Sequence, residues 1–172
     1  ASKFKISERS IIQVEFEGNI KSALNEISVS RKNTTSLITI DTKLDNQYLN
    51  TYWADGLIIS TPTGSTGYSL SCGGPIIMPD SKNFVLTPIA PHNLNARPLV
   101  ISDEKKIEIS INGRESEYFV SADSKIFSVS INSKLNISKA PHVLKMIEFE
   151  DDSYINTLRE KLMWGKDRRT EQ

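Results

Sequence analysis

Several features that would assign a protein to a specialised class are scarce in this 172-residue sequence. Its single cysteine, Cys72, cannot form a disulfide within the chain, which is typical of proteins from a reducing compartment. No apolar run approaches the roughly 20 residues that span a bilayer, and the first residues lack the apolar core of a signal peptide. The sequence therefore predicts a cytoplasmic protein with no membrane partner.

The charge balance also lacks an excess of either sign. Lys plus Arg is 21 and Asp plus Glu is 21, so the formal net charge is zero. Because nucleic-acid-binding domains usually carry a basic excess, we expect no nucleic-acid partner. The two histidines and the one cysteine stand at no metal-ligand spacing, so we expect no metal site formed by this chain. Its 38% hydrophobic residues are ordinary for a globular domain.

Short segments of alternating apolar and polar residues, separated by turn signals, dominate the chain. The Asp45-Asn46 pair lies between two of them and predicts a β-hairpin. Many short strands without βαβ alternation predict a mainly β fold: a multi-stranded, β-sandwich-like domain with one short loop-helix at a ligand site and a C-terminal helix. Strands are expected over residues 10–17, 26–31, 36–42, 47–53, 57–60, 84–87, 99–102, 106–111, 118–121, 127–131 and 134–137.

The end of the sequence has a helical pattern instead. Asp152-Ser153 is a good helix N-cap. We expect the helix to end at Gly165, with Trp164 as its apolar anchor and a charged tail beyond. The chain is accordingly divided into a β domain over 1–150 and a helix with its tail over 151–172. The apolar positions at helical spacing are Tyr154, Ile155, Leu158, Leu162 and Met163.

The segment from Ser60 to Ser71 is the strongest site candidate. It has seven hydroxyl side chains in twelve residues, and its glycines allow a ligand to approach the backbone closely. It also precedes a short helix, whose free N–H groups favour polar or anionic ligands. With the aromatic face of Tyr68 and the carboxylate of Asp55 nearby in sequence, it predicts a nucleotide or sugar site. The alternative is an ordinary solvated turn, and the Lys spacing of a phosphate-binding P-loop is missing.

Three motifs in order give this chain a resemblance to a known family. Asp55 to Ser71, continued by Gly73-Gly74-Pro75, resembles the long signature of the NAD kinases. Ala23-Leu24-Asn25-Glu26 is similar to an upstream element of that family, and Pro88 to Pro98 is similar to a downstream one. The chain thus resembles the C-terminal, NAD-binding domain of ATP-NAD kinases.

The resemblance implies an enzyme that transfers the γ-phosphoryl group of ATP to the adenosine 2′-hydroxyl of NAD, making NADP. It implies that Asn25 and Glu26 bind the ribose hydroxyls, that Asp55 is a second polar anchor, and that the segment from Thr66 to Ser71 wraps the dinucleotide. An amide beside a carboxylate can fix a diol through paired hydrogen bonds. The NAD-binding residues implied in this way are Asn25, Glu26, Asp55, Thr63, Thr66, Gly67, Tyr68, Ser69, Leu70, Ser71 and Ala90.

The sequence also departs from the family pattern. Gly67 replaces a usual alanine, Lys125 a common amide, and Trp53 a frequent basic residue. The Gly-Gly-Asp-Gly-Thr motif is missing from these 172 residues. In the family it lies on an N-terminal α/β domain, where its aspartate activates the ribose hydroxyl. We therefore expect no catalytic residue in this chain, and no activity from the chain by itself.

By the same resemblance, Mg²⁺ or another divalent metal should arrive with ATP, and the enzyme should be a homodimer or homotetramer. Two alternatives remain open: a non-catalytic nucleotide- or carbohydrate-binding β-sandwich, and a related two-domain lipid or sugar kinase. His92 and His142 are expected to have structural or surface roles, and Arg97 to brace a loop.

Overall fold

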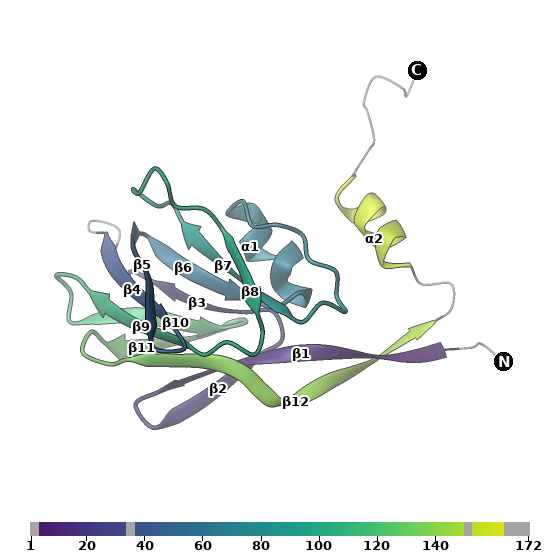
Figure 1. Ribbon diagram of the computed structural model, residues 1–172, viewed down its shortest axis with the longest axis horizontal. Coiled ribbons are helices and arrows are strands. Elements are labelled where there is room, and N and C mark those ends of the chain that lie inside the picture. The colour runs from purple at the N-terminus through teal and green to yellow at the C-terminus, as the bar shows by residue number, and fades with distance from the viewer. Residues whose placement is uncertain (1–3, 34–36, 150–152, 164–172) are drawn as a thin grey trace, which may run out of the picture. The chain divides into compact units, whose positions relative to one another are not determined.

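The computed structural model describes residues 4–33, 37–149 and 153–163 (Figure 1). The chain forms two compact units. One comprises residues 9–144, and the other combines residues 1–8 with residues 145–172.

The larger unit is built on two six-stranded antiparallel sheets, and the two long strands β1 and β12 continue from it into the smaller unit. The first sheet has the order β2 (Asn19–Ala23), β1 (Phe4–Phe16), β12 (Leu135–Phe149), β9 (Ile107–Asn112), β4 (Ile38–Leu44), β5 (Gln47–Ala54). The second has the order β11 (Lys125–Ser130), β10 (Glu117–Ala122), β3 (Glu26–Ser30), β6 (Gly56–Ser60), β7 (Asn83–Ile89), β8 (Leu99–Ser102).

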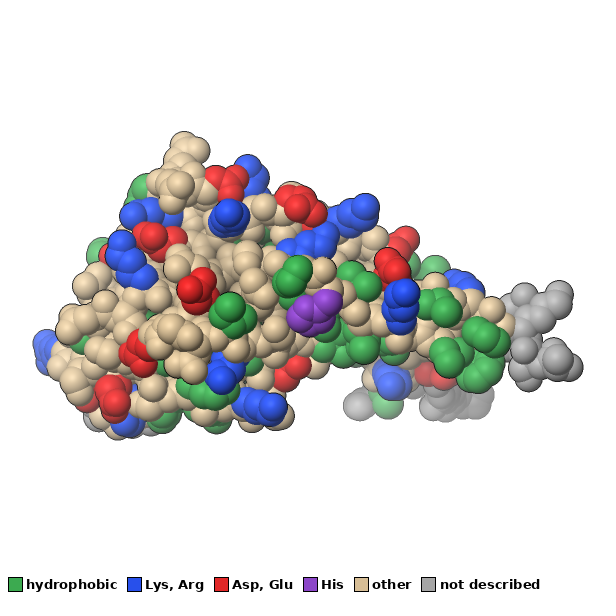
Figure 2. All heavy atoms as spheres, turned by 90° about the horizontal axis from the view of Figure 1, so that it is seen from below, with side chains coloured by type: hydrophobic (Ala, Val, Ile, Leu, Met, Phe, Trp, Pro, Cys, Tyr) green, Lys and Arg blue, Asp and Glu red, His purple; other side chains and the backbone are tan. Residues whose placement is uncertain are grey.

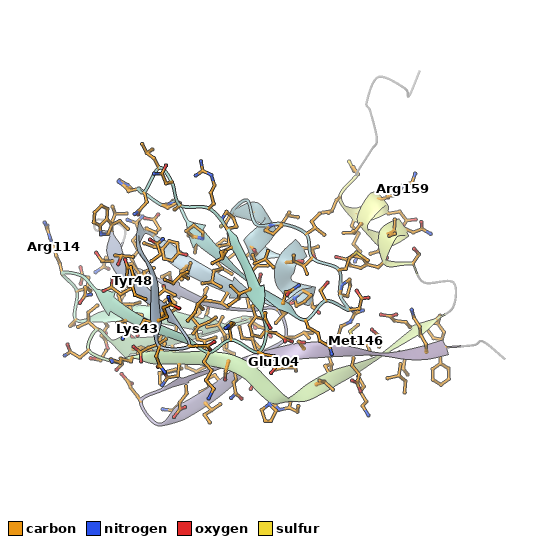
Figure 3. All side chains as sticks on the ribbon, viewed as in Figure 1. Lys43, Tyr48, Glu104, Arg114, Met146 and Arg159 are labelled. Carbon is orange, nitrogen blue, oxygen red and sulfur yellow. The ribbon has the colours of Figure 1, made fainter. Side chains whose placement is uncertain are left out.

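The inner faces of both sheets contribute to one apolar core. Ile40 of β4 and Leu86 of β7, for example, belong to the same cluster and are fully buried. On the outer side of the first sheet the alternating residues of β4 and β9 are polar. Lys43 of β4 pairs with Glu108 at 2.9 Å, and the Tyr48 hydroxyl of β5 is 3.0 Å from the Thr51 hydroxyl. Lys43 and Tyr48 are labelled in Figure 3. This division of apolar and polar residues confirms the predicted β-sandwich.

The β4–β5 hairpin turns where the sequence predicted. Asp45 and Asn46 have φ values of 48° and 68°, the left-handed conformation that short polar residues tolerate. Three other elements differ from expectation. β1 begins at Phe4, six residues before the predicted start at residue 10, and β2 was not among the expected strands. β12 continues twelve residues beyond the predicted end at Ile137. From Pro141 onward β12 has no buried position, so the alternation that reveals a strand is missing there.

The hydroxyl-rich segment after β6 forms a 3₁₀ turn, η1 (Thr63–Thr66), followed by the one-turn helix α1 (Tyr68–Ser71). The helix was predicted, whereas the turn was expected to be an irregular loop. Every residue of β6 is buried, since its neighbours include the core on one face and α1 on the other. The segment is therefore packed against the second sheet rather than solvated.

The smaller unit contains the outer ends of β1 and β12, which are linked by an ion pair of 3.2 Å between Lys5 and Glu148. It also contains α2 (Tyr154–Lys161), whose N-cap Ser153 accepts a hydrogen bond from the Asn156 amide, as the sequence predicted. α2 ends before the predicted Gly165, because Met163 already has a φ of 51°. Trp164 and Gly165 lie outside the described residues. None of the helices in the described ranges has the length and apolarity to cross a membrane.

Candidate functional site

One end of the second sheet brings together residues that are far apart in sequence. The register pairs Glu26 of β3 with Ser60 of β6, and Ile27 with Ala122 of β10. The β2–β3 junction, the β10–β11 turn and the segment after β6 therefore lie side by side. Of the predicted residues, Asn25 and Glu26 belong to the first of these segments, and Thr63, Thr66 and Gly67 to the last.

The backbone of Asn25 and Glu26 is held from two sides. On one side, the Asp123 carboxylate accepts hydrogen bonds from the N–H groups of Leu24, Asn25 and Glu26 at 2.9, 2.8 and 3.3 Å. On the other side, Thr61 donates its N–H to the Asn25 carbonyl at 2.8 Å and its hydroxyl to the Leu24 carbonyl at 2.6 Å. These bonds fix where the Asn25 and Glu26 side chains begin.

The start of η1 packs directly on this segment. A Cβ on Gly64 would overlap the backbone of Asn25, so only glycine permits the approach. The Gly64 N–H donates to the Thr61 hydroxyl at 3.2 Å, and the buried Ser65 hydroxyl donates to the Pro62 carbonyl at 2.7 Å. The hydroxyls of Thr61 and Ser65 therefore stabilise the turn itself.

Glu26 has an unusual electrostatic environment. Partial burial, reinforced by the negative charge of Asp123, raises the pKa of the Glu26 carboxyl above its usual range. A Cβ on Gly67 would lie 3.7 Å from Glu26 Oε2, which places the exposed Gly67 beside this carboxyl. When ionised, the carboxyl can accept hydrogen bonds from ligand hydroxyls.

Asp55 and Ala90 lie at the opposite end of the same strands. Asp55 joins β5 to β6, and its carboxylate pairs with the Arg31 guanidinium at 2.9 Å. Its N–H donates to the Ile89 carbonyl at 3.0 Å, and its carbonyl accepts from the Arg31 N–H at 3.0 Å. Ala90 follows β7 with a φ of 44°, which is rare for a residue with a side chain. These two predicted residues are thus separated from Glu26 by the length of β6.

The α1 helix presents its residues in different ways. Tyr68 is 48% exposed, and burial together with the charges of Cys72 and Asp55 raises the pKa of its hydroxyl. Ser69 is fully buried, and its hydroxyl is 2.8 Å from the Thr87 hydroxyl. Leu70 is half-buried and Ser71 is exposed. Tyr68 and Ser71 therefore face solvent, whereas the Ser69 hydroxyl joins α1 to β7.

The loop after Ala90 is attached to the β5 strand. The His92 N–H donates to the Trp53 carbonyl at 2.7 Å, and the Trp53 N–H donates to Asn93 Oδ1 at 2.8 Å. Arg97 donates to the carbonyls of Leu94 and Ala96 at 2.9 and 2.8 Å, in agreement with the loop-bracing role predicted for it. Trp53 itself is exposed beside this loop.

Comparison with known families identifies the fold. A family model described as the ATP-NAD kinase C-terminal domain matches residues 24–149. The chain belongs to the ATP-NAD kinase family. The match covers the Asn25-Glu26 segment, the η1–α1 segment and the loop after Ala90, which are the three regions that carry the resemblance in sequence.

Relatives of this ATP-NAD kinase domain are longer than the chain. It is 56% identical to the NAD kinase of Christiangramia forsetii, over 97% of this chain and 59% of that protein. It is 61% identical to the NAD kinase of Flavobacterium johnsoniae, over 86% of this chain and 50% of that protein. The chain thus spans less than two thirds of the length of these curated relatives.

Two solved structures share the architecture. The crystal structure of yeast NADH kinase complexed with NADH has a TM-score of 0.89 at 24% identity, over 96% of this chain and 52% of that one. The crystal structure of an NAD kinase from Archaeoglobus fulgidus in complex with ATP has a TM-score of 0.76 at 28% identity, over 92% and 61%. The first supports the fold of the ATP-NAD kinase C-terminal domain, and the second agrees with it.

Three residues that fix the backbone of the candidate site were not named as candidates in the sequence: Asp123, Arg31 and Asn93. Thr61 belongs to the predicted hydroxyl-rich segment, but its bonds to Leu24 and Asn25 were not predicted. The sequence positions of Asp123 and Thr61 do not reveal their distant partners. As for metals, the described residues bring no three His, Cys, Asp or Glu side chains together in a cluster able to hold an ion.

Proposed function

We propose that the protein containing this chain is an NAD kinase, which transfers the γ-phosphoryl group of ATP to the adenosine 2′-hydroxyl of NAD, and that this chain supplies the NAD-binding half. The observation that carries the proposal is the Asn25-Glu26 pair, fixed by Asp123 and Thr61 beside η1. An amide and an ionised carboxyl side by side can hold both hydroxyls of a ribose ring. Family membership favours this activity over a related lipid or sugar kinase.

The distribution of the candidate residues suits a long ligand. Asp55 precedes β6 and Ser60 ends it five residues later, so the two ends of the site are about 17 Å apart at roughly 3.3 Å per residue. A dinucleotide is an elongated molecule with a polar group at each end. In our proposal one nucleoside lies at Asn25-Glu26, the other lies toward Asp55 and Ala90, and Tyr68 offers a ring face between them.

The phosphoryl-transfer chemistry is assigned outside this chain. By the family resemblance, the Mg²⁺ of our proposal would arrive with ATP and be held largely by its phosphates. No described residue is given the role of activating the 2′-hydroxyl. The same proposal includes a cytoplasmic homodimer or homotetramer, which rests on the family resemblance.

Calorimetric titration of the 172-residue chain with NAD tests the binding half of the proposal. We expect measurable binding, and a loss of more than about tenfold in affinity for both Asn25→Ala and Glu26→Ala. Asn136→Ala, an exposed asparagine on β12 of the other sheet, is the matched control and should leave affinity unchanged. Absence of NAD binding, with binding of a simple sugar instead, would favour a carbohydrate-binding module and refute the kinase proposal.

A coupled assay for NADP tests the assignment of the chemistry. The chain supplied with NAD, ATP and Mg²⁺ should produce no NADP, whereas the full-length protein should produce it. NADP formation by the chain alone would show that the reactive group lies within these 172 residues. No activity from the full-length protein would contradict the kinase function itself.

A further inference from the structure

The Asp123 carboxylate accepts hydrogen bonds from the backbone of another segment. Asp123 lies in the turn between β10 and β11, about a hundred residues from its partners in sequence, and has a φ of 51°. Its two carboxylate oxygens receive three backbone N–H groups, and its own N–H donates to the Glu26 carbonyl at 3.0 Å. Four hydrogen bonds thus join one turn residue to three consecutive residues.

Hydrogen bonds hold the backbone of Leu24 and Asn25 from two sides. Leu24 and Asn25 offer their N–H groups to Asp123 and their carbonyls to Thr61. Hydrogen bonds to an ionised acceptor are stronger than those between neutral groups, and a carboxylate can accept several at once. The segment before β3 is therefore restrained through both its N–H and its C=O groups, at the point where the Asn25 and Glu26 side chains leave the backbone.

We propose that Asp123 is a positioning residue for NAD binding: its carboxylate holds the Leu24–Glu26 backbone so that the Asn25 and Glu26 side chains are already oriented for a ribose diol. This inference rests on the proposed function, because it assumes that Asn25 and Glu26 contact NAD. Asp123 itself is assigned no contact with the ligand. A preorganised backbone lowers the ordering cost of binding, so its loss weakens affinity without removing a ligand contact.

Asp123→Asn is the informative change. Asparagine has the same shape and tolerates a positive φ, so the turn is retained. Its amide has only one acceptor oxygen and carries no charge, so it cannot satisfy all three N–H groups. Asp45→Asn is the matched control: Asp45 is also a turn aspartate with positive φ, and it accepts the Lys106 N–H at 3.0 Å, but it lies on the β4–β5 hairpin of the other sheet.

Two measurements on the 172-residue chain test the proposal. Calorimetry with NAD should show affinity reduced by about tenfold or more in Asp123→Asn, the equivalent of one hydrogen bond to a charged group, and unchanged in Asp45→Asn. Amide hydrogen exchange followed by NMR should accelerate at Leu24, Asn25 and Glu26 in Asp123→Asn alone. A general loss of stability would accelerate exchange across both sheets, which separates the two effects.

The outcomes are distinct. If Asp123→Asn accelerates exchange at residues 24–26 but binds NAD as tightly as the unchanged chain, the positioning role is refuted and NAD binding stands. Unchanged exchange at these amides also refutes it. If the unchanged chain does not bind NAD, the proposed function fails, and the positioning role fails with it. Should Asp123→Asn not fold, Asp123→Glu keeps the charge and displaces the carboxylate, and the same loss of affinity is expected.

Discussion

At the scale of single residues, Glu26 and Asp123 form a carboxyl pair with unequal surroundings. Asp123 is satisfied by backbone N–H groups, whereas Glu26 is partly buried beside the Asp123 charge. The pKa of Glu26 is consequently raised. Removing its proton is more costly in the folded chain than in the unfolded one.

The first prediction follows from this pKa. Between the ordinary Glu pKa of 4.5 and the raised folded value, the native state binds more protons than the unfolded state, so stability falls as pH rises through that window. Glu26→Gln removes this contribution. Urea unfolding at a series of pH values gives the free energy of unfolding of both proteins. The difference in favour of the variant should grow as pH rises through this window and stay constant above it.

Asp45→Asn provides a control of opposite sign. Hydrogen bonds from Lys105 and Lys106 lower the pKa of Asp45, so its carboxylate contributes stability above its unfolded pKa that is lost as pH falls. Its variant should therefore be destabilised at neutral pH and approach the unchanged chain in acid. Parallel stability curves for Glu26→Gln and the unchanged chain would contradict the electrostatic description of Glu26.

The second prediction concerns Gly64. A Cβ at this position would overlap the Asn25 backbone, which cannot move without breaking its bonds to Asp123 and Thr61. Gly64→Ala should lower the free energy of unfolding by about 2 kcal/mol or more and abolish NAD binding. Gly113→Ala, where the nearest atom would be 3.5 Å away, is the control and should be nearly neutral in denaturant unfolding.

Gly67→Ala addresses the departure from the family pattern. The added Cβ would lie 3.3 Å from the Gly64 carbonyl oxygen, so a small adjustment is needed. Since the family usually has alanine here, we expect the variant to fold and to bind NAD.

For the Gly64 prediction, equal losses of stability in Gly64→Ala and Gly113→Ala would contradict the close approach of η1 to Asn25.

The sequence singled out some residues of the candidate site and not others, for a physical reason. Asn25, Glu26 and the segment after Thr61 stand in motifs that resemble a family, and so could be named before the fold was known. The Asp123 carboxylate accepts a hydrogen bond from the Asn25 N–H, which is 98 residues away in sequence. No local sequence pattern predicts such a contact. The placement of Asp55 and Ala90 at the far end of β6 also depends on strand register, which single motifs do not specify.

At the scale of elements, α1 shows how a short helix is kept in place. One helical turn is marginal by itself. Its buried Ser69 hydroxyl bonds to Thr87 of β7, and Gly74 lies so close to both that a Cβ there would clash. The helix is therefore stabilised by tertiary contacts rather than by its own hydrogen bonds.

Ser69→Ala should then lower the free energy of unfolding by about 1–3 kcal/mol, because the Thr87 hydroxyl is left buried with its partner removed. Ser71→Ala changes an exposed hydroxyl of the same helix and should cost less than about 0.5 kcal/mol. Chemical denaturation of both variants checks this third prediction. Similar effects at the two positions would mean that the Ser69–Thr87 bond contributes little.

Strands were predicted correctly where one face of the strand is buried and the other is exposed. The β4–β5 hairpin has apolar and polar residues in alternation and a turn sequence that fixes it, and it was predicted. The last nine residues of β12 are exposed or half-buried, so its continuation beyond Ala140 could not be predicted from periodicity. β2 is only five residues long, and it is recognised as a strand through its antiparallel pairing with β1.

At the scale of the whole molecule, charge and apolar surface are distributed differently. Figure 2 shows acidic and basic side chains interspersed over one face, as expected for zero net charge. The smaller unit, in contrast, has exposed apolar side chains on both of its strands, including Phe4, Ile6, Ile147 and Phe149. If such side chains form one contiguous surface, that surface should promote association and the binding of hydrophobic dyes.

The fourth prediction tests whether these side chains act as one surface. Phe4 and Ile147 are 58% and 62% exposed, and replacing them together (Phe4→Ser, Ile147→Lys) should reduce fluorescence of the dye ANS and self-association measured by light scattering. Ile20→Lys with Ile126→Lys is the matched control, because these residues are 60% and 67% exposed but stand on two different sheets of the larger unit. Scattered apolar side chains bind little dye, so the control should have a small effect. Equal reductions in the two double variants would show that total apolar exposure, rather than its concentration on the smaller unit, governs association.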